Sequence, residues 1–255
     1  MGRNMKTLAA CCALFVSILS FAGCADSRGS VQPDAGPVGM LTWTGDDGQE
    51  YGLYLPAAPT DTRVPVVMYL HGFTGDPINS PPWFIQPLNQ IEPCAVFLPT
   101  RPASEGASAW GGTYDDALRP GMIAALAELD KLLATRNLDT RRQYVYGDSM
   151  GGEGVFKLLV EFPDRFAGAV AVAGYTLDVG ADLMARTALW IFHGSDDTVN
   201  PTSSSQTIYQ SILAAGGTRV KYTEYPGLDH ESIWAKVPTE PGLCDWLLSQ
   251  RLVPL

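Results

Sequence analysis

The sequence contains few residues of the kinds that bind metals, nucleic acids or anionic surfaces. Its 255 residues include three histidines and five cysteines, and 27 Asp and Glu residues outnumber 17 Lys and Arg residues. The formal net charge of -10 argues against nucleic acids and anionic lipid surfaces as partners. No cluster of His, Cys and carboxylate residues has the spacing of a metal site, so none is expected.

A long apolar run at the N-terminus indicates a signal peptide over residues 1–23. Arg3 and Lys6 precede the apolar stretch Leu8–Phe21, which is too short to span a bilayer comfortably. The stretch ends in Phe21-Ala-Gly-Cys24, and small residues before a cysteine resemble a bacterial lipobox. We therefore expect Cys24 to carry a lipid that anchors an exported protein, facing the periplasm or the cell exterior. The alternative is plain secretion with a buried Cys24.

Residues 24–39 are rich in Ser, Gly, Asp and Pro, which is typical of a flexible tether. Residues 40–255 then suit one globular domain, which we expect to be monomeric. Loss of Arg3 and Lys6 with the signal peptide would take the formal charge from -10 to -12.

The mature chain would keep Cys94 and Cys244 besides Cys24. This pair could form a disulfide in an exported protein, and two free thiols are the alternative.

Short β-type runs alternate with helical patterns along the domain, which indicates an α/β fold with a mostly parallel sheet. Strands are expected at residues 40–44, 50–55, 64–70, 94–98, 143–147, 167–173, 188–193 and 220–225. Helices are expected at residues 115–134, 154–162, 201–215 and 242–251, with Pro120 as a bend or the true start of the first.

The segment Gln143–Gly152 predicts a strand that turns sharply into a helix, with Ser149 at the corner. Its core, Gly147-Asp-Ser-Met-Gly151, fits the G-x-S-x-G pattern of a nucleophile elbow. Such a tight turn crowds the backbone, so the flanking positions must be small. The turn would expose Ser149 Oγ above the sheet and direct the N–H of Met150 to the place where an oxyanion would form.

A serine hydroxyl needs a base to become a nucleophile, and that base needs an acid to orient it. The chain order Ser, acid, His that accompanies this elbow selects His230 from the three histidines, because it leaves an acid-bearing loop after Ser149. That loop contains Asp196 and Asp197, and spacing alone does not rank them. Either carboxylate could instead cap the helix that follows.

Four segments together resemble the α/β-hydrolase superfamily. They are Leu70-His-Gly-Phe-Thr-Gly75, Gly147-Asp-Ser-Met-Gly-Gly152, His193-Gly-Ser-Asp-Asp-Thr-Val-Asn-Pro201 and Gly227-Leu-Asp-His-Glu231. The likeness is to compact bacterial esterases of the phospholipase/carboxylesterase-like, feruloyl-esterase-like and polyhydroxybutyrate-depolymerase-like groups. It implies an eight-stranded type of sheet with helices on both faces.

The resemblance also implies roles for individual residues. In the family pattern His-Gly-x-x-Asp-x-x-x-Pro, the acid that orients the catalytic histidine stands four residues after the first histidine, which is Asp197 here. Family members usually have Val before the proline, where this sequence has Asn200. The backbone N–H of Phe73 would form an oxyanion hole with that of Met150, while His71 and His193 would brace their loops. The implied reaction is hydrolysis of a carboxylic ester through an acyl-enzyme on Ser149, without a cofactor.

The segment 174–186 is too short to contain a large cap, which predicts an open cleft. Aromatic residues on loops could line that cleft, with Trp110 and Trp234 as the selected substrate contacts; the others are Phe73, Trp83 and Tyr175. Short-chain, feruloyl, acetyl or polymeric esters would suit it. The competing functions are a prolyl-oligopeptidase-like serine peptidase and a surface-binding protein that has lost catalysis.

Overall fold

The computed structural model describes residues 38–59, 61–102, 104–105, 110–111 and 117–252. The chain divides into two compact units, Met1–Gln32 and Pro33–Leu255, and every described residue belongs to the second. The expected signal peptide (1–23), Cys24 and most of the expected tether (24–39) therefore lie outside the described residues. Within the described part, no helix is both long enough and apolar enough to span a bilayer.

An eight-stranded sheet runs through the described unit in the order β1-β2-β4-β3-β5-β6-β7-β8. Strands β3 to β8 are parallel, and β2 pairs antiparallel with both β1 and β4. The strands are β1 Gly39–Thr44, β2 Glu50–Leu55, β3 Val64–Leu70, β4 Ala95–Pro99, β5 Leu138–Asp148, β6 Gly168–Val172, β7 Ala188–Gly194 and β8 Val220–Tyr225.

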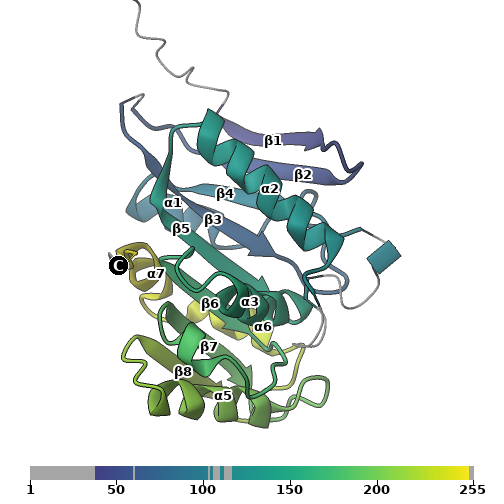
Figure 1. The fold of residues 1–255 in the computed structure, drawn as a ribbon, viewed down its shortest axis with the longest axis vertical. Helices are drawn as coiled ribbons and strands as arrows, with labels where there is room; N and C mark the ends of the chain where they lie inside the picture. Colours follow the sequence, from purple (N-terminus) through teal and green to yellow (C-terminus); the bar gives the residue numbers. More distant parts are fainter. Residues whose placement is uncertain (1–37, 60, 103, 106–109, 112–116, 253–255) are drawn as a thin grey trace, which may run out of the picture. The chain divides into compact units, whose positions relative to one another are not determined.

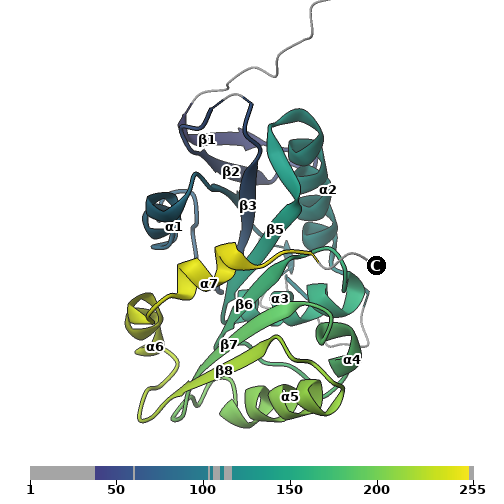
Figure 2. The ribbon, with the colours of Figure 1, turned by 90° about the vertical axis from the view of Figure 1, so that its left-hand side faces the viewer.

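Helices cover both faces of the sheet, as Figures 1 and 2 show. One face packs against α2 Pro120–Thr135, α3 Met150–Glu161, α4 Ala181–Met184 and α5 Thr202–Ala214. The other packs against α1 Ile85–Ile91, α6 Ile233–Lys236, the 3₁₀ helix η2 Val237–Thr239 and α7 Leu243–Ser249. Each face has its own apolar cluster, so the central strands are buried on both sides.

The burial of each strand follows from its sequence. The runs at β4 and β6 are continuously apolar, β7 is apolar up to His193, and every residue in the three strands is buried, as expected for parallel strands between two helical layers. Strand β1 instead alternates between half-buried and exposed positions, which suits an edge strand covered on one face.

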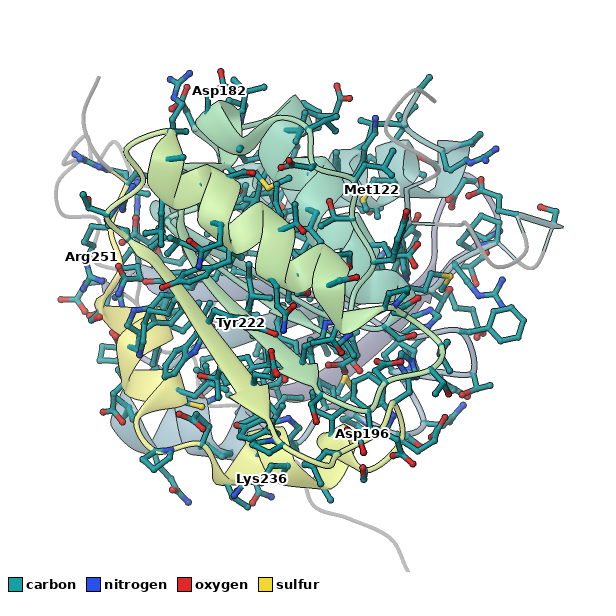
Figure 3. All side chains as sticks on the ribbon, turned by 90° about the horizontal axis from the view of Figure 1, so that it is seen from below. Met122, Asp182, Asp196, Tyr222, Lys236 and Arg251 are labelled. Carbon is teal, nitrogen blue, oxygen red and sulfur yellow. The ribbon has the colours of Figure 1, made fainter. Side chains whose placement is uncertain are left out.

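The carboxyl ends of the parallel strands meet at one edge of the sheet, where ligand sites of doubly wound folds lie. Figure 3 views the sheet from β8 and shows Asp196 beside the tip of that strand, with Arg251 near the opposite end. Between β6 and β7 the chain forms only the four-residue helix α4. No cap is inserted at this point, where all residues are described.

Differences from the expected elements lie mostly at the ends. Helix α2 begins at Pro120, because proline has no N–H and fits the first turn of a helix. Strand β5 begins at Leu138, earlier than expected, although polar Arg141 and Arg142 interrupt its apolar pattern. The short helices α1, α4 and α6 were not predicted, since their few residues show little periodicity.

Cys94 and Cys244 are free thiols, so the structure does not contain the disulfide considered above. The Cys94 Sγ lies in the core, 3.5 Å from the carbonyl oxygen of Ala95. Burial raises the pKa of Cys94 well above its usual range and that of Cys244 to about 11. Both thiols are therefore protonated at neutral pH and unreactive.

Candidate active site

The turn from β5 into α3 has the strained geometry of a nucleophile elbow. Ser149 has φ 52° and ψ -115°, a conformation that side-chain-bearing residues rarely adopt. A Cβ on Gly147 would lie 2.1 Å from the carbonyl oxygen of Gly151, and one on Gly151 would lie 1.8 Å from that of Leu70. Both positions therefore require glycine, and the crowded backbone holds Ser149 half-exposed above the sheet.

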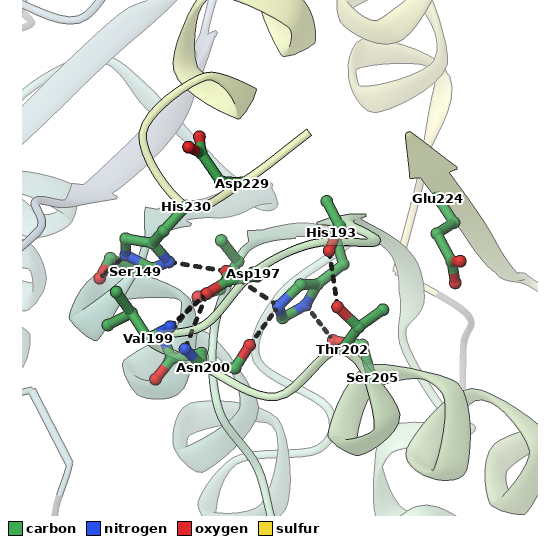
Figure 4. A network of polar contacts seen from close by, with 12 residues as sticks. Ser149, His193, Asp197, Val199, Asn200, Thr202, Ser205, Glu224, Asp229 and His230 are labelled. Carbon is green, nitrogen blue, oxygen red and sulfur yellow. Dashed lines mark hydrogen bonds and ion pairs between the residues drawn. The ribbon is translucent and has the colours of Figure 1, made fainter. Parts of the chain in front are cut away.

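The structure joins the three side chains selected from the sequence into one hydrogen-bonded chain, drawn in Figure 4. Ser149 Oγ lies 2.8 Å from His230 Nε2, and His230 Nδ1 lies 2.7 Å from Asp197 Oδ2. Because a carboxylate only accepts hydrogen bonds, Nδ1 carries the proton and Nε2 is free to accept the serine hydrogen. This is the arrangement that activates a serine nucleophile.

Asp197 and Asp196 have different surroundings, which resolves the choice that spacing left open. Asp197 is buried, and its Oδ1 accepts the backbone N–H groups of Val199 and Asn200, each at 2.8 Å. Asp196 is exposed and accepts the hydroxyl of Ser195 at 2.7 Å. Of the two aspartates, only Asp197 contacts His230.

Two backbone amides beside Ser149 are available as oxyanion donors. Among the described residues, neither the N–H of Phe73 nor that of Met150 donates a hydrogen bond within the protein. The loop that carries Phe73 is close to the elbow, since a Cβ on Gly72 would lie 3.6 Å from Ser149 Cβ. Arg101 supports this loop by donating to the carbonyl of Phe73 at 3.1 Å, with its guanidinium 4.9 Å from the ring centroid.

Trp110 and Trp234 occupy different environments. Trp110 is fully buried, and its indole N–H donates to the carbonyl of His71 at 2.8 Å. The prediction that Trp110 contacts substrate is therefore wrong; the residue packs beneath the loop that carries Phe73. Trp234 is half-buried, and its ring meets that of His230 edge-on at 5.2 Å, which leaves it beside the nucleophile's base.

Burial raises the pKa of two carboxyl groups near Ser149. Burial raises the pKa of Asp148 to about 7, although the Tyr69 hydroxyl donates to this carboxyl at 2.7 Å and opposes the shift. Burial also raises the pKa of Glu153, one helical turn after Ser149, to about 7. The remaining histidines are buried too, and burial lowers the pKa of both His71 and His193.

The described residues include no group of three or more His, Cys, Asp or Glu side chains that could hold a metal ion.

Sequence reasoning missed the residues that hold Asp197. The amides of Val199 and Asn200 contact its Oδ1, and the Asn200 side chain donates to the carbonyl of Ala173 at 2.7 Å. Ser205, on α5, contacts His193 Nδ1 at 2.8 Å. The sequence pointed to this segment through the His-Gly-x-x-Asp pattern and the unusual Asn before Pro201, but it did not show the bonds that these residues make.

Comparison with known families agrees with this geometry. The family model named Esterase matches residues 48–236, most of the chain. The chain belongs to the Esterase family. Its family and fold place it in the α/β-hydrolase superfamily. A search of curated protein sequences finds no match for this chain.

Several solved structures are similar to this chain. A thermostable esterase is 27% identical to this chain, with a TM-score of 0.72; the matched region covers 83% of this chain and 62% of the thermostable esterase. This chain therefore spans about three-fifths of that protein's length. A ferulic acid esterase is 14% identical with a TM-score of 0.63, covering 82% of this chain and 96% of its own. An S-formylglutathione hydrolase from Agrobacterium tumefaciens is 17% identical with a TM-score of 0.60, covering 84% and 95%.

Proposed function

We propose that the protein hydrolyses carboxylic esters through an acyl-enzyme on Ser149, with His230 as general base and acid and Asp197 as its orienting carboxylate. The observation that carries the proposal is the unbroken chain of hydrogen bonds from Ser149 Oγ through both ring nitrogens of His230 to Asp197. Membership of the Esterase family supports the same reaction class.

In the proposed cycle, His230 Nε2 takes the hydroxyl proton as Ser149 Oγ attacks the ester carbonyl. Asp197 stabilises the imidazolium, and the amides of Phe73 and Met150 donate to the oxyanion of the tetrahedral intermediate. The imidazolium then protonates the leaving alcohol, and water repeats the sequence on the acyl-enzyme. Each step uses a group that lies at the elbow or beside it.

An accessible, uncapped site favours esters on large or polymeric molecules, including acetyl and feruloyl groups. Phe73 has 54% of its surface exposed and Tyr175 has 39%, and both follow strands that end at the same edge of the sheet as Ser149. With half-buried Trp234, they would offer apolar contact to the acyl or alcohol group of a substrate.

A series of p-nitrophenyl esters with acyl chains from two to sixteen carbons tests the activity in wild type and Ser149→Ala. We expect the highest kcat/KM on the shortest chains and a loss of at least about 1000-fold in the variant, because the triad acts as a unit. Equal rates in the two proteins would contradict the proposal. Hydrolysis of peptide anilides without hydrolysis of esters would indicate a peptidase instead.

We also propose that the protein is exported and anchored by a lipid on Cys24. This rests on the apolar stretch Leu8–Phe21 and the small residues before Cys24. In a bacterial host, labelled palmitate should be incorporated into the full chain and not into Cys24→Ser. Equal labelling of both chains, or none in either, would contradict the lipid anchor.

A further inference from the structure

His193 is a second histidine in direct contact with the acid of the site. It lies near the end of β7, and its side chain is fully buried. Its Nδ1 lies 2.8 Å from Ser205 Oγ. Its Nε2 lies 3.0 Å from the carbonyl oxygen of Asn200 and 3.2 Å from Asp197 Oδ2. Figure 4 shows the imidazole between Asp197 and the start of α5.

These partners fix where the hydrogen of the His193 ring resides. Nε2 faces two acceptors, so it carries the hydrogen: it donates to the Asn200 carbonyl, and Asp197 Oδ2 is the second oxygen beside it. Nδ1 is then an acceptor and receives the hydroxyl hydrogen of Ser205. Burial lowers the pKa of His193, so the ring is neutral at neutral pH. The contact with Asp197, 3.2 Å from Nε2 to Oδ2, therefore joins a neutral imidazole to a carboxylate.

The same oxygen of Asp197 therefore faces two imidazoles. Oδ2 accepts Nδ1–H of His230 at 2.7 Å and lies 3.2 Å from Nε2 of His193, while Oδ1 accepts two backbone amides. The charged or titratable groups whose fields reach His193 are Asp197, His230 and, from β8, Glu224. Three donors and the adjacent His193 Nε2 leave the carboxylate little freedom to rotate away from His230.

We propose that His193 is a positioning residue of this active site, whose Nε2–H holds the Asp197 carboxylate in the orientation that His230 requires. This inference rests on the proposed function. Because His193 is buried and does not reach the substrate, its loss should affect kcat and leave KM nearly unchanged. A residue that only braces the loop through the Asn200 carbonyl would change stability and leave the pH profile alone.

The test compares His193→Phe, which keeps the ring shape without a donor, with His193→Gln, whose amide nitrogen can reach the same acceptors. Thr187→Val is the matched control. Thr187 is buried just before the other end of β7, and its hydroxyl donates to the Pro163 carbonyl at 3.1 Å. That substitution removes a buried hydrogen bond next to the opposite end of β7 from His193.

We expect His193→Phe to lower kcat about 10- to 100-fold with KM within about 3-fold, as for other partners that orient a reacting group. Without this donor the charge on Asp197 is less dispersed and stabilises the imidazolium more. The acid limb of kcat/KM should then move to higher pH, by about 0.5 unit. His193→Gln should restore most of kcat and the wild-type profile, and Thr187→Val should alter only thermal stability.

An unchanged kcat and pH profile in His193→Phe, with stability lowered as in Thr187→Val, would overturn the inference while Ser149→Ala still tests the esterase activity separately. If His193→Phe does not fold, Ser205→Ala replaces it, because that change frees the imidazole to turn. We then expect kcat to fall about 3-fold with the same direction of pH shift. Wild-type kinetics in Ser205→Ala would also overturn the inference.

Discussion

The elbow that carries Ser149 and the loops that carry Asp197 and His230 meet at one edge of the sheet but are held in different ways. At the elbow, backbone atoms approach so closely that Gly147 and Gly151 leave no room for a Cβ, and Ser149 keeps a positive φ. The position of Asp197 and His230 depends instead on hydrogen bonds to side chains and loop amides. A substitution at the elbow should therefore disrupt folding, whereas substitutions in the loops should leave the fold intact and reduce activity to different extents.

The largest expected effect is that of Gly151→Ala. The added methyl group would lie 1.8 Å from the Leu70 carbonyl oxygen, so the elbow or β3 must move. We expect a loss of more than about 4 kcal/mol of unfolding free energy, measured by urea denaturation. Gly72→Ala is the comparison, because its methyl group would have nearest neighbours at 3.4 and 3.6 Å. Wild-type stability in Gly151→Ala would break the contrast between elbow and loops.

Asp197→Asn should be the most damaging change in the loops. An amide cannot hold His230 in the same tautomer as a carboxylate, so kcat should fall about 1000- to 10,000-fold while the thermal midpoint stays close to wild type. Asp196→Asn should keep kcat within about 3-fold, since its carboxylate is exposed and bonds only locally. A larger loss for Asp196→Asn would contradict the assignment of the acid.

Substitutions of Trp110 and Trp234 should separate stability from activity in the same way, with smaller effects. Trp110→Phe removes a buried hydrogen bond to the His71 carbonyl and should cost about 1–2 kcal/mol of stability without raising KM. Trp234→Phe changes a half-buried ring beside His230 and should alter kcat/KM without a comparable loss of stability. Thermal denaturation and ester kinetics of both variants check this. The reverse pattern would restore Trp110 as a substrate contact.

The smallest expected effect concerns the pH dependence of stability at Asp148. Its folded pKa of about 7 is above the ordinary value of 3.8, so the folded state holds a proton that the unfolded state releases. Stability from this group is present below pH 4 and is lost as pH rises towards 7. From pH 5 to pH 8 the midpoint of wild type should therefore fall by about 5 °C more than that of Asp148→Asn. Parallel curves would contradict the shift.

The sequence predicted most strands and the elbow, because continuous apolar runs and glycine spacing are local signals. Strands β3 and β8 have the predicted bounds, and Ser149 lies at the predicted corner. Pro120 was recognised as a bend or start but could not be assigned to either without the packing of α2.

The parts that sequence could not supply depend on distant contacts. Trp110 looked like a loop residue open to substrate, whereas it is buried beneath the His71 loop. The contact of His193 with Asp197 joins residues four apart, but its orientation depends on Ser205 in α5. Spacing alone did not rank the two adjacent aspartates, and only the family resemblance favoured Asp197; in the structure the amides of Val199 and Asn200 hold its carboxylate in place.

The central claim is that Ser149 is a nucleophile activated by His230, and covalent labelling tests it most directly. A fluorophosphonate probe reacts with an activated serine and leaves a stable adduct that peptide mass spectrometry can locate. We expect a single label on Ser149 in wild type, none in Ser149→Ala, and labelling at least about 100-fold slower in His230→Ala. A label on another residue, or equal labelling of His230→Ala and wild type, would contradict the account.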